Sequence, residues 1–220
     1  MKTLTEMARP ERITIEGRYI RLEPLDPAKH TEALWQGLGG ETNAPLWLYM
    51  PDGPFMERGV FGAYMAAKAV SEDPLFFAIV DRETGLAVGR CTLMRIDPPN
   101  RVIEVGGIIY TQALQRSRGA TEAMFLLARY CFDHLGYRRY EWKCNALNEP
   151  SRRAALRLGF SFEGIFRQHM IIKGRNRDTA WFSMLDSEWP ARKREFERWL
   201  DESNFNSDGN QKTPLNQAGN

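Results

Sequence analysis

The sequence predicts an α/β (α+β) protein with one mixed, mostly antiparallel sheet of six to seven strands, flanked by helices. Three strand-like runs, at residues 75–81, 87–96 and 102–110, are separated only by short turns rich in Asp, Pro and Gly, which indicates an antiparallel meander. A strand, a helix near 121–135 and another strand follow, and such a unit requires one parallel, right-handed crossover. The patterns GxGxxG and GxxxxGK[ST] are both absent from the sequence, which argues against binding of a dinucleotide or a nucleoside triphosphate.

The elements before the meander follow from local signals. Apolar and charged residues alternate over 18–25, which predicts a half-buried strand. Asp26 is a good N-cap, Pro27 suits the first helical position and Gly39 a helix end, so a helix is expected between them. Residues 56–70 have helical spacing and predict a second helix.

The second half is predicted to contain, in order, a helix (121–135), a strand (138–145), a short helix (148–159), a hairpin (162–185) and a closing amphipathic helix (189–200). Gly136 and Gly159 follow the two helices and are typical C-terminal stops.

Length and composition predict one domain. The 220 residues are 43% hydrophobic and 26% charged, which is enough to bury one substantial core. We expect that domain to span residues 1–200, with its core at about 15–185. Residues 201–220 are rich in Asn, Ser, Gly and Gln, and their composition predicts a disordered polar tail.

Net charge, cysteines and histidines exclude several classes of protein. The net charge of +2 is too small to indicate a nucleic-acid or membrane partner. No apolar run approaches 18 residues and the N-terminus has no signal-peptide pattern, so we expect a cytoplasmic protein. The three cysteines lack CxxC spacing and are expected to be reduced, buried thiols. The three histidines lack metal-ligand spacing, and no metal site is predicted.

Charge is unevenly distributed along the chain. Residues 115–178 hold 13 lysines and arginines against 6 acidic residues, a local charge of +7. A compact polyanionic ligand would explain this excess, and so would a set of solvated arginines.

The polar loop before the 121–135 helix is a candidate anion site. The first N–H groups of a helix lack internal partners and lie at the positive end of its dipole. Arg116 and Arg118 could add charge-assisted hydrogen bonds, and the small residues Ser117, Gly119 and Ala120 would let a phosphate approach. A solvated connection between a strand and a helix could have the same composition, so both interpretations stay open.

The loop and two further segments resemble one known family, the GCN5-related N-acetyltransferases (GNAT), and in particular its ribosomal-protein N-terminal acetyltransferase branch. Residues 115–120, "QRSRGA", resemble the family's cofactor motif Gln/Arg-x-x-Gly-x-Gly/Ala, and "TEA" follows as it often does in that branch. Asn148-x-x-Ser151 leading to "LGF" at 158–160 resembles a second motif, and residues 18–25 resemble the branch's first strand. The resemblance covers roughly residues 15–185. It departs from the motif at Arg118, where the family has a glycine.

The resemblance implies the GNAT acyl-CoA N-acyltransferase fold and acetyl-CoA as co-substrate. An acetyl group would pass to a primary amine, of a protein N-terminus or a small molecule, by direct attack in a ternary complex. The cofactor would be bound by Asn148 and by the loop residues Gln115, Arg116, Ser117, Arg118, Gly119, Ala120 and Thr121. A non-catalytic acyl-CoA sensor of the same fold is the alternative.

A glycine pair in the middle of the strand at 102–110 bears on the thioester. Gly106-Gly107 is typical of a β-bulge, although a glycine pair could also accommodate close packing. In the family the strand separates from its neighbour at such a bulge. The resemblance therefore places the backbones of Ile108, Ile109 and Tyr110 against the pantetheine and the thioester carbonyl.

Two side chains are candidates for proton transfer. The amine must lose a proton before it attacks, and Glu104 lies eleven residues before Gln115, as the base does in the histone-acetylating members. Apolar neighbours could raise the pKa of Glu104, but an ordinary outward-facing strand glutamate would look the same. Many members protonate the leaving thiolate with a tyrosine, and here that position is Ala155. Ser151 is then the candidate acid, and helix capping by Asn148 and Ser151 is the alternative.

Other partners receive less support. An RNA-binding role would need aromatic residues interleaved with basic ones along one element, and none is present. The apolar hairpin and the last helix could form a homodimer interface.

Overall fold

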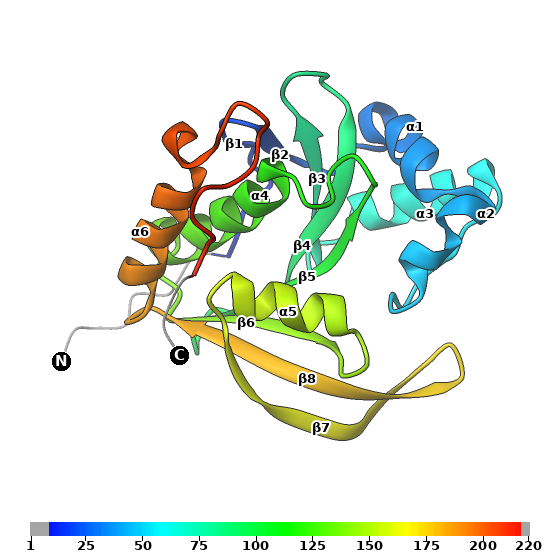
Figure 1. Ribbon diagram of the computed structural model, residues 1–220. Helices are drawn as coiled ribbons and strands as arrows, with labels where there is room; N and C mark the ends of the chain where they lie inside the picture. Colours follow the sequence, from blue (N-terminus) through cyan, green and yellow to red (C-terminus); the bar gives the residue numbers. More distant parts are fainter. Residues whose placement is uncertain (1–8, 217–220) are drawn as a thin grey trace.

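The computed structural model describes residues 9–216, in which one eight-stranded sheet carries helices on both faces (Figure 1). Predictions for residues 1–8 and 217–220 lie outside this range. The strands are β1 (Ile15–Glu16), β2 (Ile20–Pro24), β3 (Leu75–Asp81), β4 (Ala87–Asp97), β5 (Val102–Tyr110), β6 (Arg139–Asn145), β7 (Ser161–Ile172) and β8 (Arg175–Leu185).

The strand order is β1-β2-β3-β4-β5-β6-β8-β7, and every neighbouring pair is antiparallel except β5–β6. This confirms the predicted mixed, mostly antiparallel sheet with one parallel crossover. The sheet has one strand more than expected because β1 pairs with β2 over only two residues, too few to produce a readable alternation.

The helices are α1 (Pro27–Leu38), α2 (Gly40–Asn43), α3 (Arg58–Ala69), α4 (Arg118–Arg129), α5 (Glu149–Arg157) and α6 (Trp189–Leu200). Short 3₁₀ turns occur at Ala44–Trp47 and Glu202–Asn204, and α4 continues into a π-helical turn at Tyr130–His134. Asp26 caps α1, as predicted, by accepting the N–H of Ala28 at 2.9 Å. Helix α4 begins three residues earlier than the predicted 121, because Ser117 Oγ accepts the N–H of Ala120 at 3.1 Å and so caps it.

Two apolar clusters cover opposite faces of the sheet. Side chains alternate along a strand, so Leu75 and Phe77 of β3 face one cluster while Phe76 and Ala78 face the other. The first cluster packs β2–β6 and β8 against α4 and α6, and the second packs β3 and β4 against α1 and α3. We refer to these sides as the first face and the second face of the sheet.

Strands β5 and β6 separate after a short stretch of pairing. They are joined only from Val102↔Arg139 to Val105↔Trp142, whereas β6 pairs with β8 along its whole length. Gly107 has φ +56°, and the register with β4 shifts beside it so that two β5 residues lie opposite Cys91. The predicted bulge is therefore confirmed. In Figure 1 strands β3–β5 diverge from β6–β8, with α5 in front of the second group.

The C-terminal segment is ordered, and the prediction of a disordered tail is wrong over residues 201–216. Phe205 and Leu215 are 8% and 4% exposed, and Phe205 pairs with Gln211 in a short β-bridge. Asn204 Nδ2 donates to the carbonyls of Trp199 and Thr213 at 3.1 and 3.0 Å. Two apolar side chains and one buried amide hold the segment against α6 and α4 (Figure 1). The prediction failed because it used the average composition of the segment, which is polar and does not reveal a few buried side chains.

None of the helices within residues 9–216 is both long enough and apolar enough to cross a membrane.

Candidate active site

A cavity of about 420 Å³ occupies the gap where β5 and β6 separate. Trp142, Cys144 and Ser151 line it from the first face, and Glu104 and Arg177 line it from the second. The gap therefore connects the two faces of the sheet. Four of the predicted site residues contribute to its wall: Glu104, Ile108, Asn148 and Ser151.

Glu104 is 4% exposed and lies on the second face, because its neighbours Ile103 and Val105 belong to the first cluster. Its Oε2 accepts Lys143 Nζ at 2.8 Å and lies 3.0 Å from Arg95 Nε. Burial raises the pKa of Glu104, and the two cations oppose that rise only in part. Its carboxylate is therefore fixed by ion pairs and is more basic than an ordinary glutamate, so it is not the outward-facing strand residue of the alternative interpretation.

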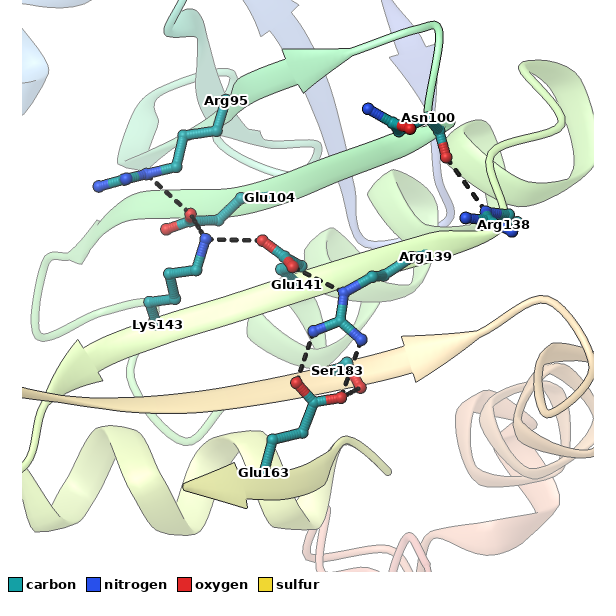
Figure 2. A network of polar contacts seen from close by, with 9 residues as sticks. All are labelled: Arg95, Asn100, Glu104, Arg138, Arg139, Glu141, Lys143, Glu163 and Ser183. Carbon is teal, nitrogen blue, oxygen red and sulfur yellow. Dashed lines mark hydrogen bonds and ion pairs between the residues drawn. The ribbon is translucent and has the colours of Figure 1, made fainter. Parts of the chain in front are cut away.

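Figure 2 shows that Glu104 begins a chain of charges across the sheet. Lys143 Nζ also donates to Glu141 Oε2 at 2.6 Å, and Arg139 Nε donates to Glu141 Oε1 at 2.7 Å. The Arg139 guanidinium then forms a two-pronged pair with Glu163, at 2.8 and 2.5 Å. Arg139 thereby lowers the pKa of Glu163 to about 2. This network ties β5, β6 and β7 together at the edge of the cavity.

Asn148 and Ser151 have structural partners. Asn148 Oδ1 accepts the Ser151 N–H at 3.2 Å and caps α5, while Ser151 Oγ accepts the indole N–H of Trp142 at 3.1 Å. A hydroxyl that accepts one hydrogen bond keeps its own proton to donate. Burial raises the pKa of Cys144, so this thiol is not an activated nucleophile.

The loop before α4 accommodates its departure from the glycine motif. Arg118 is the first residue of α4 and is right-handed, and the left-handed residue is Arg116, with φ +58°. An arginine at 118 therefore meets no backbone strain. Gly119 is required for packing, because a Cβ there would lie 2.7 Å from Ile20 Cγ2. This glycine brings α4 close to β2, whereas the sequence suggested that it makes room for a phosphate.

The side chains around this loop mostly contact the protein itself. The guanidinium of Arg118 lies 3.7 Å from the ring centroid of Phe205, in the C-terminal segment. Gln115 Nε2 donates to the Tyr110 carbonyl at 3.3 Å, and Thr121 Oγ1 accepts from Arg157 at 3.1 Å. Ile109, Tyr110 and residues 115–121 do not line the cavity. An anion at this loop would be bound chiefly by backbone N–H groups at the start of α4.

Glu122, which sequence reasoning did not single out, holds the start of α4 in place. It is 5% exposed and accepts the backbone N–H groups of Arg18, Tyr19 and Ile20 at 2.7, 2.7 and 2.9 Å. The glutamate of the "TEA" segment thus attaches α4 to the start of β2 and the turn before it.

Comparisons with known proteins agree with this architecture. Residues 20–161 match the family described as acetyltransferase (GNAT) domain. The chain belongs to the GNAT family. A crystal structure of a GCN5-related N-acetyltransferase from Brucella melitensis is 52% identical, covers 96% of each chain and has a TM-score of 0.94.

Two curated relatives match shorter stretches. "Uncharacterized N-acetyltransferase p20" of Bacillus licheniformis is 33% identical over 113 residues, which is 51% of this chain and 63% of that protein. "Putative ribosomal N-acetyltransferase YdaF" of Bacillus subtilis is 30% identical over 109 residues, 50% of this chain and 59% of that protein. The chain thus matches less than two thirds of the length of either curated relative.

Within this GNAT domain, the second-face wall of the cavity holds residues that sequence reasoning missed. Arg90 is 2% exposed; it donates to the Gly107 carbonyl at 3.0 Å and to Tyr64 Oη at 2.5 Å. Tyr64 in turn donates to Asp52 Oδ2 at 3.0 Å. An arginine inside the apolar run "AVGRCTLM" was an available signal, because a buried cation requires partners. Arg177 lies in the predicted hairpin at 162–185, and the structure places it in the cavity wall.

Metal ligation finds no support in residues 9–216, where no group of three or more His, Cys, Asp or Glu side chains is suitably arranged.

Proposed function

We propose that this protein transfers an acetyl group from acetyl-CoA to a primary amine, by direct attack within a ternary complex. The observation that carries the proposal is the cavity between β5 and β6, which is lined from both faces of the sheet. A thioester entering from the first face could meet an amine entering from the second. Membership of the GNAT family and the N-acetyltransferase names of its relatives support the same reaction.

Acetyl-CoA fits the first face. Helix α4 begins at Arg118 and packs on the first face, and the N–H groups of a helix N-terminus suit the pyrophosphate. Beyond Val105 the edge of β5 that faces β6 has no strand partner, so alternate residues of the stretch Ile108, Ile109 and Tyr110 offer backbone groups to the pantetheine. Asn148 and Ser151 form the opposite wall, at the start of α5.

Glu104 is the proposed base. An alkyl ammonium ion has a pKa of about 10, so the amine must lose a proton before it can attack. Glu104 lines the second-face part of the cavity, and its raised pKa improves it as a proton acceptor. Lys143 and Arg95 hold the carboxylate in position. Ser151 is the proposed donor to the departing thiolate, which is a weak base and needs little assistance.

The acceptor is a protein N-terminus or a small-molecule amine. The experiment incubates the protein with acetyl-CoA and a panel of amines and peptides, and measures released CoA thiol together with the mass of the acetylated product. Glu104→Gln should lower kcat by about 10²- to 10⁴-fold. It should leave acetyl-CoA affinity, measured by calorimetry, unchanged.

Glu163→Gln is the matched control, because Glu163 belongs to the same charge network but lies outside the cavity wall. Binding of acetyl-CoA without transfer to any amine would instead favour a non-catalytic acyl-CoA sensor. Equal loss of activity in both variants would assign Glu104 a structural role.

A further inference from the structure

The cavity wall carries more positive than negative charge. Five cationic side chains line it, and only Asp52 and Glu104 oppose them. The cationic residues are Lys68, Arg90, Arg95, Lys143 and Arg177. Glu104 pairs with Arg95 and Lys143, and Asp52 lies 3.8 Å from Lys68. Neither carboxylate is within ion-pair distance of Arg90 or Arg177.

Arg90 is a buried cation with an incomplete set of partners. At 2% exposure it makes hydrogen bonds through both terminal nitrogens, to a carbonyl and to a tyrosine hydroxyl, and its Nε has no partner among the described residues. The rings of Trp47, Tyr64 and Phe76 lie 5.7, 5.6 and 5.3 Å from the guanidinium carbon. These rings shield its charge from water, and a shielded cation interacts more strongly with any anion that reaches it.

Arg177 is the clearer case. Its Nε is buried without a partner, and within residues 9–216 it forms no ion pair within 4 Å. Burial lowers the pKa of Arg177, and Glu104 and Cys144 offset this only in part. The residue lies on β8, three strand positions before Ala180, and lines the same cavity as Glu104.

From this arrangement we infer that the acceptor is an amine that carries a carboxylate, with Arg177 and Arg90 binding the carboxylate while Glu104 receives the proton from the amine. The inference rests on the proposed function, whose substrate class it narrows. Acetyl-CoA does not account for these arginines, because the thioester and pantetheine that reach the cavity are uncharged. Both a free amino acid and a peptide with an acidic first residue have the required chemistry.

The test compares pairs of acceptors in which an uncharged amide replaces the carboxylate. L-alanine and L-alaninamide form the amino-acid pair; peptides Glu-Ala-Ala-Ala and Gln-Ala-Ala-Ala form the peptide pair. The measured quantity is the ratio of kcat/KM between the acid and its amide partner. Dividing the ratio for a variant by the ratio for the wild type cancels the intrinsic reactivity of each amine.

Wild type should favour the acid in one of the two pairs, and that pair identifies the source of the carboxylate. Arg177→Gln should lower the acid-to-amide ratio by about 10- to 100-fold, as expected for a lost charge-assisted hydrogen bond. Arg177→Glu should reverse the preference. Arg90→Gln should act in the same direction, with thermal unfolding confirming that this buried variant still folds.

Arg175→Gln is the control, since Arg175 lies on the same strand but is exposed and outside the cavity. Equal rates for acid and amide in the wild type, or a ratio that Arg177→Gln does not change, would overturn the inference. If acetyl-CoA binds but no amine is acetylated, the proposed function fails separately. Calorimetric binding of the acids in the presence of CoA, compared between wild type and Arg177→Gln, would then decide whether the carboxylate site exists.

Discussion

The two faces of the sheet contribute to the cavity in different ways. The first face offers mainly backbone groups: the start of α4, the unpaired edge of β5 and the cap of α5, each within one short segment. The second face offers side chains from β4, β5, β6, β8 and the loop at 49–52, which are far apart in sequence. The first arrangement suits a cofactor that many relatives share. The second arrangement allows single side chains to be substituted without altering the fold, which suits an acceptor that differs between members of the family.

The largest expected effect is on the second face, at Glu104. The carboxylate of Glu104 must lose its proton to act as a base, so kcat/KM should rise with pH. Because the pKa of Glu104 is raised, this rise should occur at a higher pH than for an ordinary glutamate. Glu104→Gln should abolish that rise and lower the rate by about 10²- to 10⁴-fold. A pH–rate profile of both proteins measures this. An unchanged profile in the variant would mean that another group accepts the proton.

On the first face, we expect substitution of Glu122 to change the stability of the fold more than the rate of the reaction. Glu122→Ala removes the charged acceptor of three backbone N–H groups, one of them buried, which should reduce the free energy of unfolding by about 4 kcal/mol. Urea denaturation measures this loss. Glu122→Gln, which keeps one acceptor oxygen, should lose less. If both variants unfold like the wild type, Glu122 does not anchor α4.

The C-terminal segment extends the first face, and Phe205 should contribute to stability. Phe205→Ala removes a ring that packs on Trp199, at 5.2 Å between centroids, and on the Arg118 guanidinium. We expect a loss of about 2 to 3 kcal/mol, measured by thermal unfolding. Ile171→Ala, at a side chain 80% exposed, is the control and should change little. If Phe205→Ala unfolds at the same temperature as the wild type, the C-terminal segment does not pack on α4 and α6 in solution.

The smallest expected effect concerns the outer end of the charge network. The pKa of Glu163 falls from 4.5 to about 2 on folding. Its pair with Arg139 therefore stabilises the fold fully above pH 4.5, and this contribution is lost as the pH falls towards 2. Because the Glu163 side chain is 39% exposed, solvent screening keeps the effect small. Unfolding measured between pH 5 and 2 should show a shallower pH dependence for Glu163→Gln than for the wild type.

The sequence predicted the features that depend on a few neighbouring residues, and it did not predict those that depend on the order of the strands. Local signals located β3 and β5 at their observed bounds, the Asp26 cap and the bulge at Gly106-Gly107. Each depends on a few consecutive residues. Arg177 and Lys143 could not be assigned because their positions in the cavity wall depend on which strands become neighbours. The order β5-β6-β8 brings Arg177 and Glu104 into the wall of one cavity, and residue spacing does not encode that arrangement.

We propose that the first face binds acetyl-CoA through the backbone at the start of α4, despite the arginine at position 118. Calorimetric titration with acetyl-CoA, and with CoA lacking the 3′-phosphate, tests it most directly. We predict roughly micromolar affinity for acetyl-CoA, and an affinity that changes less than about threefold in Arg118→Ala, whose side chain stacks on Phe205. CoA without the 3′-phosphate shows whether the positively charged segment at 115–178 also binds that phosphate. The absence of binding at millimolar acetyl-CoA would show that the start of α4 does not bind the cofactor.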